Sequence, residues 1–138
     1  MFTSVRNKKY LLRVFIIYIG IAAFIALFGG VYEQFSHGVM SKHMIYAYHM
    51  TLGFGVLGYL ILLIIPFKRG PGIVGECAYN TGVALITTRS VFMGVLEIYG
   101  KTNDRMVIIY TVLSILFLVA GAILFVVTLF IPEKGTEN

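Results

Sequence analysis

The sequence has little charge. Its 138 residues include 11 Lys and Arg and 6 Asp and Glu, which together make 12% of the chain, against about 25% in a typical soluble domain. Hydrophobic residues reach 59% and the mean hydropathy is +0.90. A soluble fold of this length could not cover its surface with so few charges. The composition therefore excludes a soluble enzyme, a nucleic-acid-binding module and a disordered tail.

Cysteine is also scarce, because Cys77 is the only one in the chain. A single cysteine excludes an intramolecular disulfide, a redox site made of a cysteine pair and a zinc site made of several thiolates. A lone cysteine within an apolar run is typical of a small buried hydrophobic residue, and we predict that role for Cys77.

What the sequence does contain is four long apolar runs. A membrane-spanning helix needs about 20 mostly apolar residues, and continuous runs favour helices over the alternating strands of a barrel. The predicted spans are residues 11–32, 42–67, 73–99 and 106–131, with a short basic turn at 68–72. Because the connections are short, we predict an all-α polytopic membrane protein: one membrane domain, residues 1–138, folded as an antiparallel four-helix bundle.

The first apolar run follows a basic stretch, as in a signal peptide, but it is longer than the roughly 7–15 residues of a signal-peptide core. Leu27 also stands where a cleavage site before Gly29 needs a small residue. We therefore interpret this run as a retained first span. The fourth run is rich in Leu, Ile, Val and Phe, and we predict that it forms a lipid-facing wall.

The positions of the basic residues predict the orientation. With the N-terminus inside, seven basic residues fall on the cytoplasmic side and three in the outer loops. The cytoplasmic set is Arg6, Lys8, Lys9, Arg13, Lys68, Arg69 and Lys134, and the outer set is Lys42, Lys101 and Arg105. The positive-inside rule therefore predicts both termini in the cytoplasm, with the chain a multi-pass membrane protein. It also explains the net charge of +5 without a nucleic-acid partner.

Rows of small residues predict where helices touch, because small side chains let backbones approach closely in lipid. The rows are Ala22, Ala26 and Gly30; Ala47, Thr51 and Gly55; Ala78 and Gly82; and Ser90 and Gly94. They are predicted to pack the bundle and, as an alternative, a homodimer.

The third span is unusually polar. Arg89 lies about ten residues, or roughly 15 Å, from the outer end of this helix, so it should face the bundle interior and have an acidic partner. Glu33 is the preferred partner and Glu97 the second choice. Two interpretations stay open: an anion or substrate site that opens to the outside, and an interhelical ion pair that fixes the register of the helices. Asn80 and Thr87 share another stripe and could line a path.

All three histidines lie between residues 37 and 49, interleaved with methionines. His43 and His49 are about 240° apart on one helix, so they cannot ligate one haem iron together, and we predict no metal and no cofactor. His49 is predicted either to sense or relay protons or to donate a hydrogen bond to a carbonyl. His37 is included as a polar residue of the outer loop. Tyrosines near the span ends are predicted to form an interfacial belt: Tyr10, Tyr18, Tyr32, Tyr46 and Tyr99.

Four segments of the chain resemble those of a known group of proteins. They are YEQFSHGV (32–39), MIYAY (44–48), YNTG (79–82) and GVLEIYG (94–100). Over residues 10–130 the chain resembles small uncharacterised four-span membrane proteins of Gram-positive, Firmicutes-type bacteria. The resemblance implies a bacterial membrane protein of this topology, and it implies no catalytic or binding role for any residue.

Three functional hypotheses follow. The first is a non-enzymatic accessory or partner-binding subunit that has a polar, outward-facing site, with no catalytic residue assigned. Its candidate residues are Glu33, His37, His49, Arg89 and Glu97. The second is a small homodimeric transporter or exporter with Asn80, Thr87 and Arg89 on its path. The third is a haem- or quinone-linked redox protein that uses His49.

Overall fold

The computed structural model describes residues 8–36, 38–65, 72–101 and 104–130. Every regular element in these ranges is helical: α1 (Lys8–Phe35), α2 (Lys42–Met50), η1 (Thr51–Val56), α3 (Leu57–Ile64), α4 (Ile73–Ile98) and α5 (Asp104–Phe130). α2, η1 and α3 follow one another without a break. Four helical segments are long and apolar enough to span a membrane: Lys8–Phe35, Lys42–Ile64, Ile73–Ile98 and Arg105–Thr128. The predicted all-helical class is therefore confirmed, and each of the four predicted spans overlaps one helical segment that is long and apolar enough to cross a membrane.

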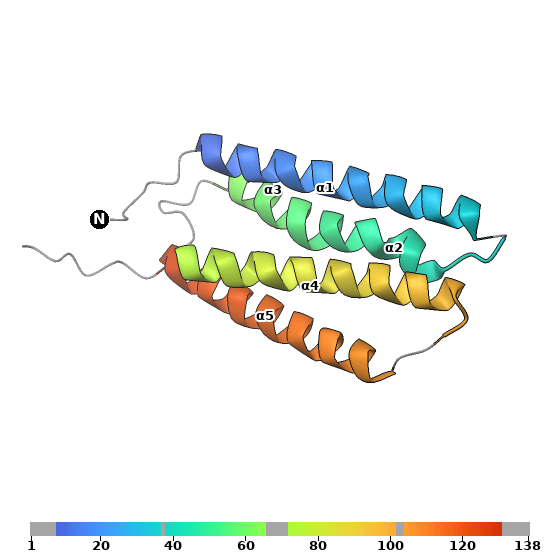
Figure 1. Cartoon of the computed structure of the whole chain (residues 1–138). Coiled ribbons are helices and arrows are strands. Elements are labelled where there is room, and N and C mark those ends of the chain that lie inside the picture. Colours follow the sequence, from blue (N-terminus) through green and yellow to red (C-terminus); the bar gives the residue numbers. More distant parts are fainter. Residues whose placement is uncertain (1–7, 37, 66–71, 102–103, 131–138) are drawn as a thin grey trace, which may run out of the picture.

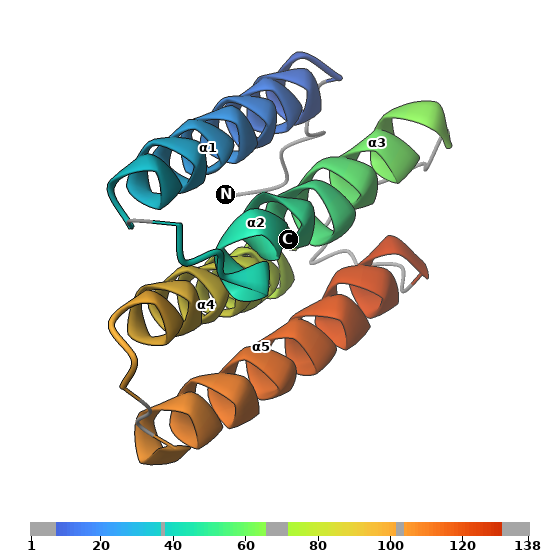
Figure 2. The same ribbon diagram turned by 90° about the vertical axis from the view of Figure 1, so that its right-hand side faces the viewer.

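The four segments lie side by side with similar axes (Figures 1 and 2). α4 packs most extensively against α5 on one side and against α2 on another, while α1 packs against α2, η1 and α3. α1 and α5 consequently lie at opposite edges of the molecule (Figure 2). This arrangement decides which polar residues can meet.

Glycine allows the closest approach, between α4 and α5. A Cβ atom added to Gly82 would lie 2.5 Å from the backbone nitrogen of Leu118, and one added to Gly121 would collide with the backbone of Tyr79. The two backbones touch here because neither glycine carries a side chain, which is how small residues drive helix association in lipid.

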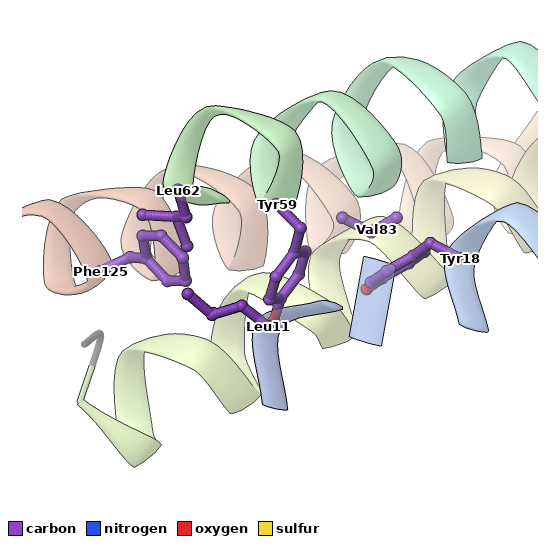
Figure 3. Packing of buried hydrophobic residues seen from close by; sticks show 6 residues of the cluster. All are labelled: Leu11, Tyr18, Tyr59, Leu62, Val83 and Phe125. Atoms are coloured by element: carbon purple, nitrogen blue, oxygen red, sulfur yellow. The ribbon is translucent and has the colours of Figure 1, made fainter. Parts of the chain in front are cut away.

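An aromatic and aliphatic cluster ties the segments together (Figure 3). Its buried members are Leu11 and Tyr18 of α1, Tyr59 and Leu62 of α3, Val83 of α4 and Phe125 of α5. The ring centroids of Tyr18 and Tyr59 are 5.5 Å apart, and Phe125 meets Tyr59 edge-on at 6.3 Å. Both geometries are favourable for aromatic pairs.

The second span contains a π-helical turn, η1, which the sequence analysis did not predict. The backbone N–H of Leu57 bonds to the carbonyl of Leu52, five residues earlier. The hydroxyl of Tyr79 donates to the carbonyl oxygen of Phe54 within this turn at 2.6 Å. Such turns interrupt α-helices in short pieces, and here the interruption presents a carbonyl to the neighbouring helix.

The burial of the small residues shows which of the predicted rows lie at contacts between helices. Ala47, Thr51 and Gly55 are all buried, and so are Gly82, Ser90 and Gly94, whereas Ala78 is half-buried. For α1 the prediction of a contact within the bundle is wrong in part: Ala22 is buried, but Ala26 and Gly30 are exposed. The buried row of α1 consists of Tyr18, Ala22, Ile25 and Gly29. The error arises because the side chains that fill this contact include large ones, which a search for small residues misses.

The prediction that Cys77 is buried is also wrong, because Cys77 is exposed. It follows two buried residues of α4, Gly75 and Glu76, and at 100° per residue it is carried past the packed face. α5 has mostly exposed apolar side chains, as expected of a wall against lipid, but it buries Ser114, Gly121 and Phe125.

Candidate functional site

Two polar clusters and one groove are candidate sites. The first cluster, here called the tyrosine–carboxylate network, consists of Tyr10, Tyr18, Tyr59, Glu76 and Asn80. The second cluster and the groove lie at the rim, which we define as the end of the molecule where α1 and α4 end and α2 and α5 begin (Figure 1).

Glu76 is the buried carboxyl group of the network. It lies in the first turn of α4, where the helix dipole favours a negative charge. Only 2% of Glu76 is exposed. Its Oε1 atom accepts hydrogen bonds from the hydroxyls of Tyr10 at 2.9 Å and Tyr59 at 3.0 Å. An acid on α4 is thereby bonded to both α1 and α3.

Asn80 lies one turn further along α4 and extends the network. Its Oδ1 atom is 2.8 Å from the Tyr18 hydroxyl and 3.0 Å from the Tyr59 hydroxyl. The Tyr59 hydroxyl therefore lies near two acceptors but has one hydrogen, so it donates to one of them at a time. Figure 3 shows Tyr18 of α1 and Tyr59 of α3 meeting in this region.

The network corrects one prediction and adds two residues. Tyr18 is not part of an interfacial belt, because its side chain is buried and hydrogen-bonded to Asn80. Tyr59 and Glu76 were not predicted as site residues. The sequence did carry a signal for Tyr59, since it continues the row Ala47, Thr51 and Gly55 at the next four-residue step.

The polar residues further along α4 also bond to neighbouring helices. Thr87, which is buried, shares a hydrogen bond of 3.0 Å with the buried Thr51 of η1. Arg89 is half-buried and its Nε donates to the Thr111 hydroxyl of α5 at 2.5 Å. Thr111 in turn donates to the carbonyl of Val107 at 2.7 Å.

The predicted ion pair of Arg89 with Glu33 or Glu97 is wrong. Arg89 points to α5, whereas Glu33 belongs to α1 at the opposite edge of the molecule and Glu97 bonds to residues at the start of α2. A hydroxyl is therefore the partner of the guanidinium. The prediction failed because angles around one helix do not reveal which neighbour each face meets.

The rim cluster is made of Ser41, His43 and Glu97. Ser41 is the N-cap of α2: its hydroxyl accepts from the N–H of Met44 at 3.2 Å and donates to Glu97 Oε2 at 2.5 Å. His43 Nδ1 lies 2.7 Å from Glu97 Oε1, and the two side chains are 38% and 40% exposed. The cluster thus joins the start of α2 to the end of α4 and leaves a charged group accessible at the surface.

The histidine predictions have mixed outcomes. His37 lies outside the described residues. His49 is exposed, and its ring packs against Tyr46 and Tyr48 with centroid distances of 5.4 and 4.1 Å. The histidine that meets Glu97 is His43, which the sequence analysis did not select. In the part of the chain that the structure describes, no three His, Cys, Asp or Glu residues are grouped as metal ligands.

The groove lies beside this cluster. It has a volume of about 320 Å³, and the last turn of α1 and the end of α4 form its walls. Its lining residues are Tyr32, Phe35, Ser36, Ile98 and Tyr99. The Ser36 hydroxyl is directed to the carbonyls of Glu33 and Val39, each at 2.6 Å, so it fixes the turn rather than facing outward.

Glu33 lies in the same turn as the groove residues of α1. Its Oε1 atom is buried and accepts no hydrogen bond from the residues that the structure describes. An unsatisfied carboxylate oxygen costs free energy, so it marks a place where a bound donor or cation would be stabilised.

Comparison of the chain with protein-family models, with curated proteins and with solved structures finds no match. The geometry of these sites is therefore the basis on which a function can be assigned.

Proposed function

We propose that this chain is a non-enzymatic small integral membrane protein, an accessory subunit that binds a ligand or a protein partner at its rim. In this proposal it crosses the bacterial cytoplasmic membrane as an antiparallel four-helix bundle with both termini in the cytoplasm. The partner is the bilayer together with another membrane protein or a second copy of the chain. The resemblance to four-span proteins of Gram-positive bacteria is part of the same proposal.

The proposal rests on the difference between the polar groups inside the spans and those at the rim. The polar groups inside the spans bond to neighbouring helices: Glu76 and Asn80 to tyrosines, Thr87 to Thr51, and Arg89 to Thr111. In lipid such bonds hold helices together. At the rim, by contrast, the Glu97 and His43 side chains are accessible next to a groove of about 320 Å³.

Exposed apolar side chains also belong to the segments that meet at the rim. Phe35, Met40 and Tyr99 are each more than 70% exposed (76%, 75% and 71%), and Tyr46 is 54% exposed. Aromatic residues and methionine are enriched at protein interfaces, and an apolar surface with a polar centre is typical of a contact site. The rim therefore has the composition of a binding surface.

The alternative function, a transporter, requires Asn80, Thr87 and Arg89 to line one path. Asn80 and Thr87 bond to α1, α3 and η1, whereas Arg89 bonds to α5, so the three serve two different interfaces. This distribution supports a structural role for them and favours the binding proposal over the transporter.

Photo-crosslinking in native membranes tests the proposal. A benzophenone amino acid replaces Tyr99 at the rim, and a matched variant replaces Leu116, which is 57% exposed on α5. We expect a discrete adduct from position 99 that weakens in the Glu97→Gln background, and none of the same mass from position 116. Equal adducts from both positions, or no effect of Glu97→Gln, would contradict a specific rim site.

A further inference from the structure

The groove at the rim has the chemistry of a site for an ammonium group. Three of its lining residues are aromatic: Tyr32 and Phe35 of α1 and Tyr99 of α4. Aromatic rings attract a cation over their faces within about 6 Å, and sites for quaternary ammonium groups are commonly built from several such rings. A volume of about 320 Å³ is sufficient for a small head group.

Two acidic residues near the groove have the negative charge that an ammonium group requires in a partner. Glu33 occupies the turn of α1 that supplies Tyr32 and Phe35, and its buried Oε1 accepts no hydrogen bond within the described part of the chain. Glu97 directly precedes Ile98 and Tyr99 on the other wall. An acidic residue therefore lies within one helical turn of the aromatic residues on both α1 and α4.

A cationic residue follows the end of α4 closely in the sequence. Lys101 is exposed and follows Tyr99 by two residues. A ligand that combines an ammonium group with a phosphate would place the ammonium between the aromatic walls and the phosphate near Lys101. This pairing of opposite charges matches the head group of a zwitterionic phospholipid.

The position of the groove favours a lipid over a soluble amine. The groove lies at the end of two helices that are long and apolar enough to cross a membrane, which is the level of the head groups. On α1, the turns that precede the groove expose Leu27, Phe28 and Val31, at 70%, 40% and 53%. These side chains offer an apolar surface for the acyl chains of the same molecule.

We propose that the groove binds the ammonium head group of a zwitterionic phospholipid. The inference rests on the proposed function in one respect, that the rim is a binding surface, and it names the chemical class of one ligand of that surface. Tyr32 and Tyr99 hold the ammonium, the Glu33 carboxylate compensates its charge, and Lys101 contacts the phosphate.

Native mass spectrometry of the purified full-length chain tests this assignment. Phosphatidylethanolamine, phosphatidylcholine and phosphatidylglycerol are offered at equal concentrations, and the fraction of protein that retains each lipid is measured. We expect the two ammonium lipids to bind about tenfold more tightly than phosphatidylglycerol, since two cation–π contacts of moderate strength correspond to that factor.

Variants connect the preference to the groove. The double variant Tyr32→Ala/Tyr99→Ala should bind all three lipids equally, whereas Tyr32→Phe/Tyr99→Phe, which keeps the rings, should retain the preference. Tyr46→Ala is the matched control, because Tyr46 is exposed at the same end but does not line the groove. Glu33→Gln should reduce the preference without abolishing it.

Three outcomes would overturn the proposal: equal retention of all three lipids by the unaltered chain, loss of the preference in Tyr46→Ala, or complete displacement of the lipid by soluble tetramethylammonium, which would indicate a soluble amine as ligand. Each is distinguishable from failure of the proposed function, because an adduct from position 99 that depends on Glu97 would still establish a rim site.

Discussion

At the scale of single residues, the hydroxyl of Tyr59 links two polar side chains of α4. Tyr59 is fully buried and lies 3.0 Å from both Glu76 Oε1 and Asn80 Oδ1. Since a hydroxyl has one hydrogen, Tyr59 alternates between the two acceptors while Tyr10 and Tyr18 supply the others. The network is thus a set of coupled bonds between α1, α3 and α4.

Removing this hydroxyl gives a measurable prediction. Tyr59→Phe keeps the ring contacts with Tyr18 and Phe125 but removes the hydroxyl hydrogen that Glu76 and Asn80 share. We expect the free energy of unfolding in detergent to fall by about 1 kcal/mol. Thermal and denaturant unfolding followed by circular dichroism measure the change.

The control for this substitution is Tyr46→Phe, which removes a hydroxyl from a side chain that is 54% exposed and should leave stability unchanged. The effects of Tyr59→Phe and Asn80→Ala should also be less than additive, because both remove the same bond. Full additivity would show that the Tyr59–Asn80 contact contributes nothing.

At the scale of helices, the contact between α4 and α5 depends on residues without side chains. The Cβ atom of an alanine at position 82 would lie 2.5 Å from the backbone nitrogen of Leu118, and a backbone cannot move aside as a flexible side chain can. α5 would have to shift, and the Arg89–Thr111 bond between the same two helices would be strained with it.

We therefore expect Gly82→Ala to destabilise the protein by about 1–3 kcal/mol, the usual cost of overpacking. Gly30→Ala is the matched control: it makes the same change in α1, where nothing lies within 4 Å, and it should be neutral or slightly stabilising because alanine favours helices. Unfolding temperatures of the two variants give the comparison. Similar temperatures for both would contradict a tight α4–α5 contact.

The helices themselves were predictable, but their pairing was not. Lipid requires every backbone group to bond within its own segment, so a run of about 20 apolar residues determines a helix without reference to the rest of the chain. The predicted second span begins at Lys42, as the structure has it, although the π-helical turn η1 was missed. The row Ala47, Thr51 and Gly55 correctly identified a buried face.

The partners of polar side chains depend on how the helices are arranged around one another, which the sequence pattern does not contain. Arg89 was predicted to meet an acid and instead meets Thr111, because its face of α4 is covered by α5. Glu97 was correctly placed near the end of the span, but its bonds to Ser41 and His43 depend on where α2 begins. For the same reason Tyr18 was assigned to the membrane interface although it is buried.

At the scale of the whole molecule, the distribution of basic residues in the sequence predicts how the bundle is oriented across the membrane. The predicted topology assigns seven basic residues to the cytoplasmic side and three to the outer loops. The proposed orientation places the rim, with its groove and the Glu97 cluster, outside the cytoplasm. This orientation decides from which side of the membrane a partner or ligand would reach the rim.

Cysteine accessibility in intact cells tests it. In a Cys77→Ser background, which removes the only native cysteine, single cysteines replace Lys101 at the rim and Lys9 at the start of α1, both of which are exposed. A membrane-impermeant maleimide should label position 101 in intact cells and position 9 only after permeabilisation. Labelling of both after permeabilisation shows that each thiol is reactive, so the difference reports sidedness alone. The reverse pattern would place the rim in the cytoplasm, where its groove would meet the inner leaflet, and would contradict the positive-inside assignment on which the orientation depends.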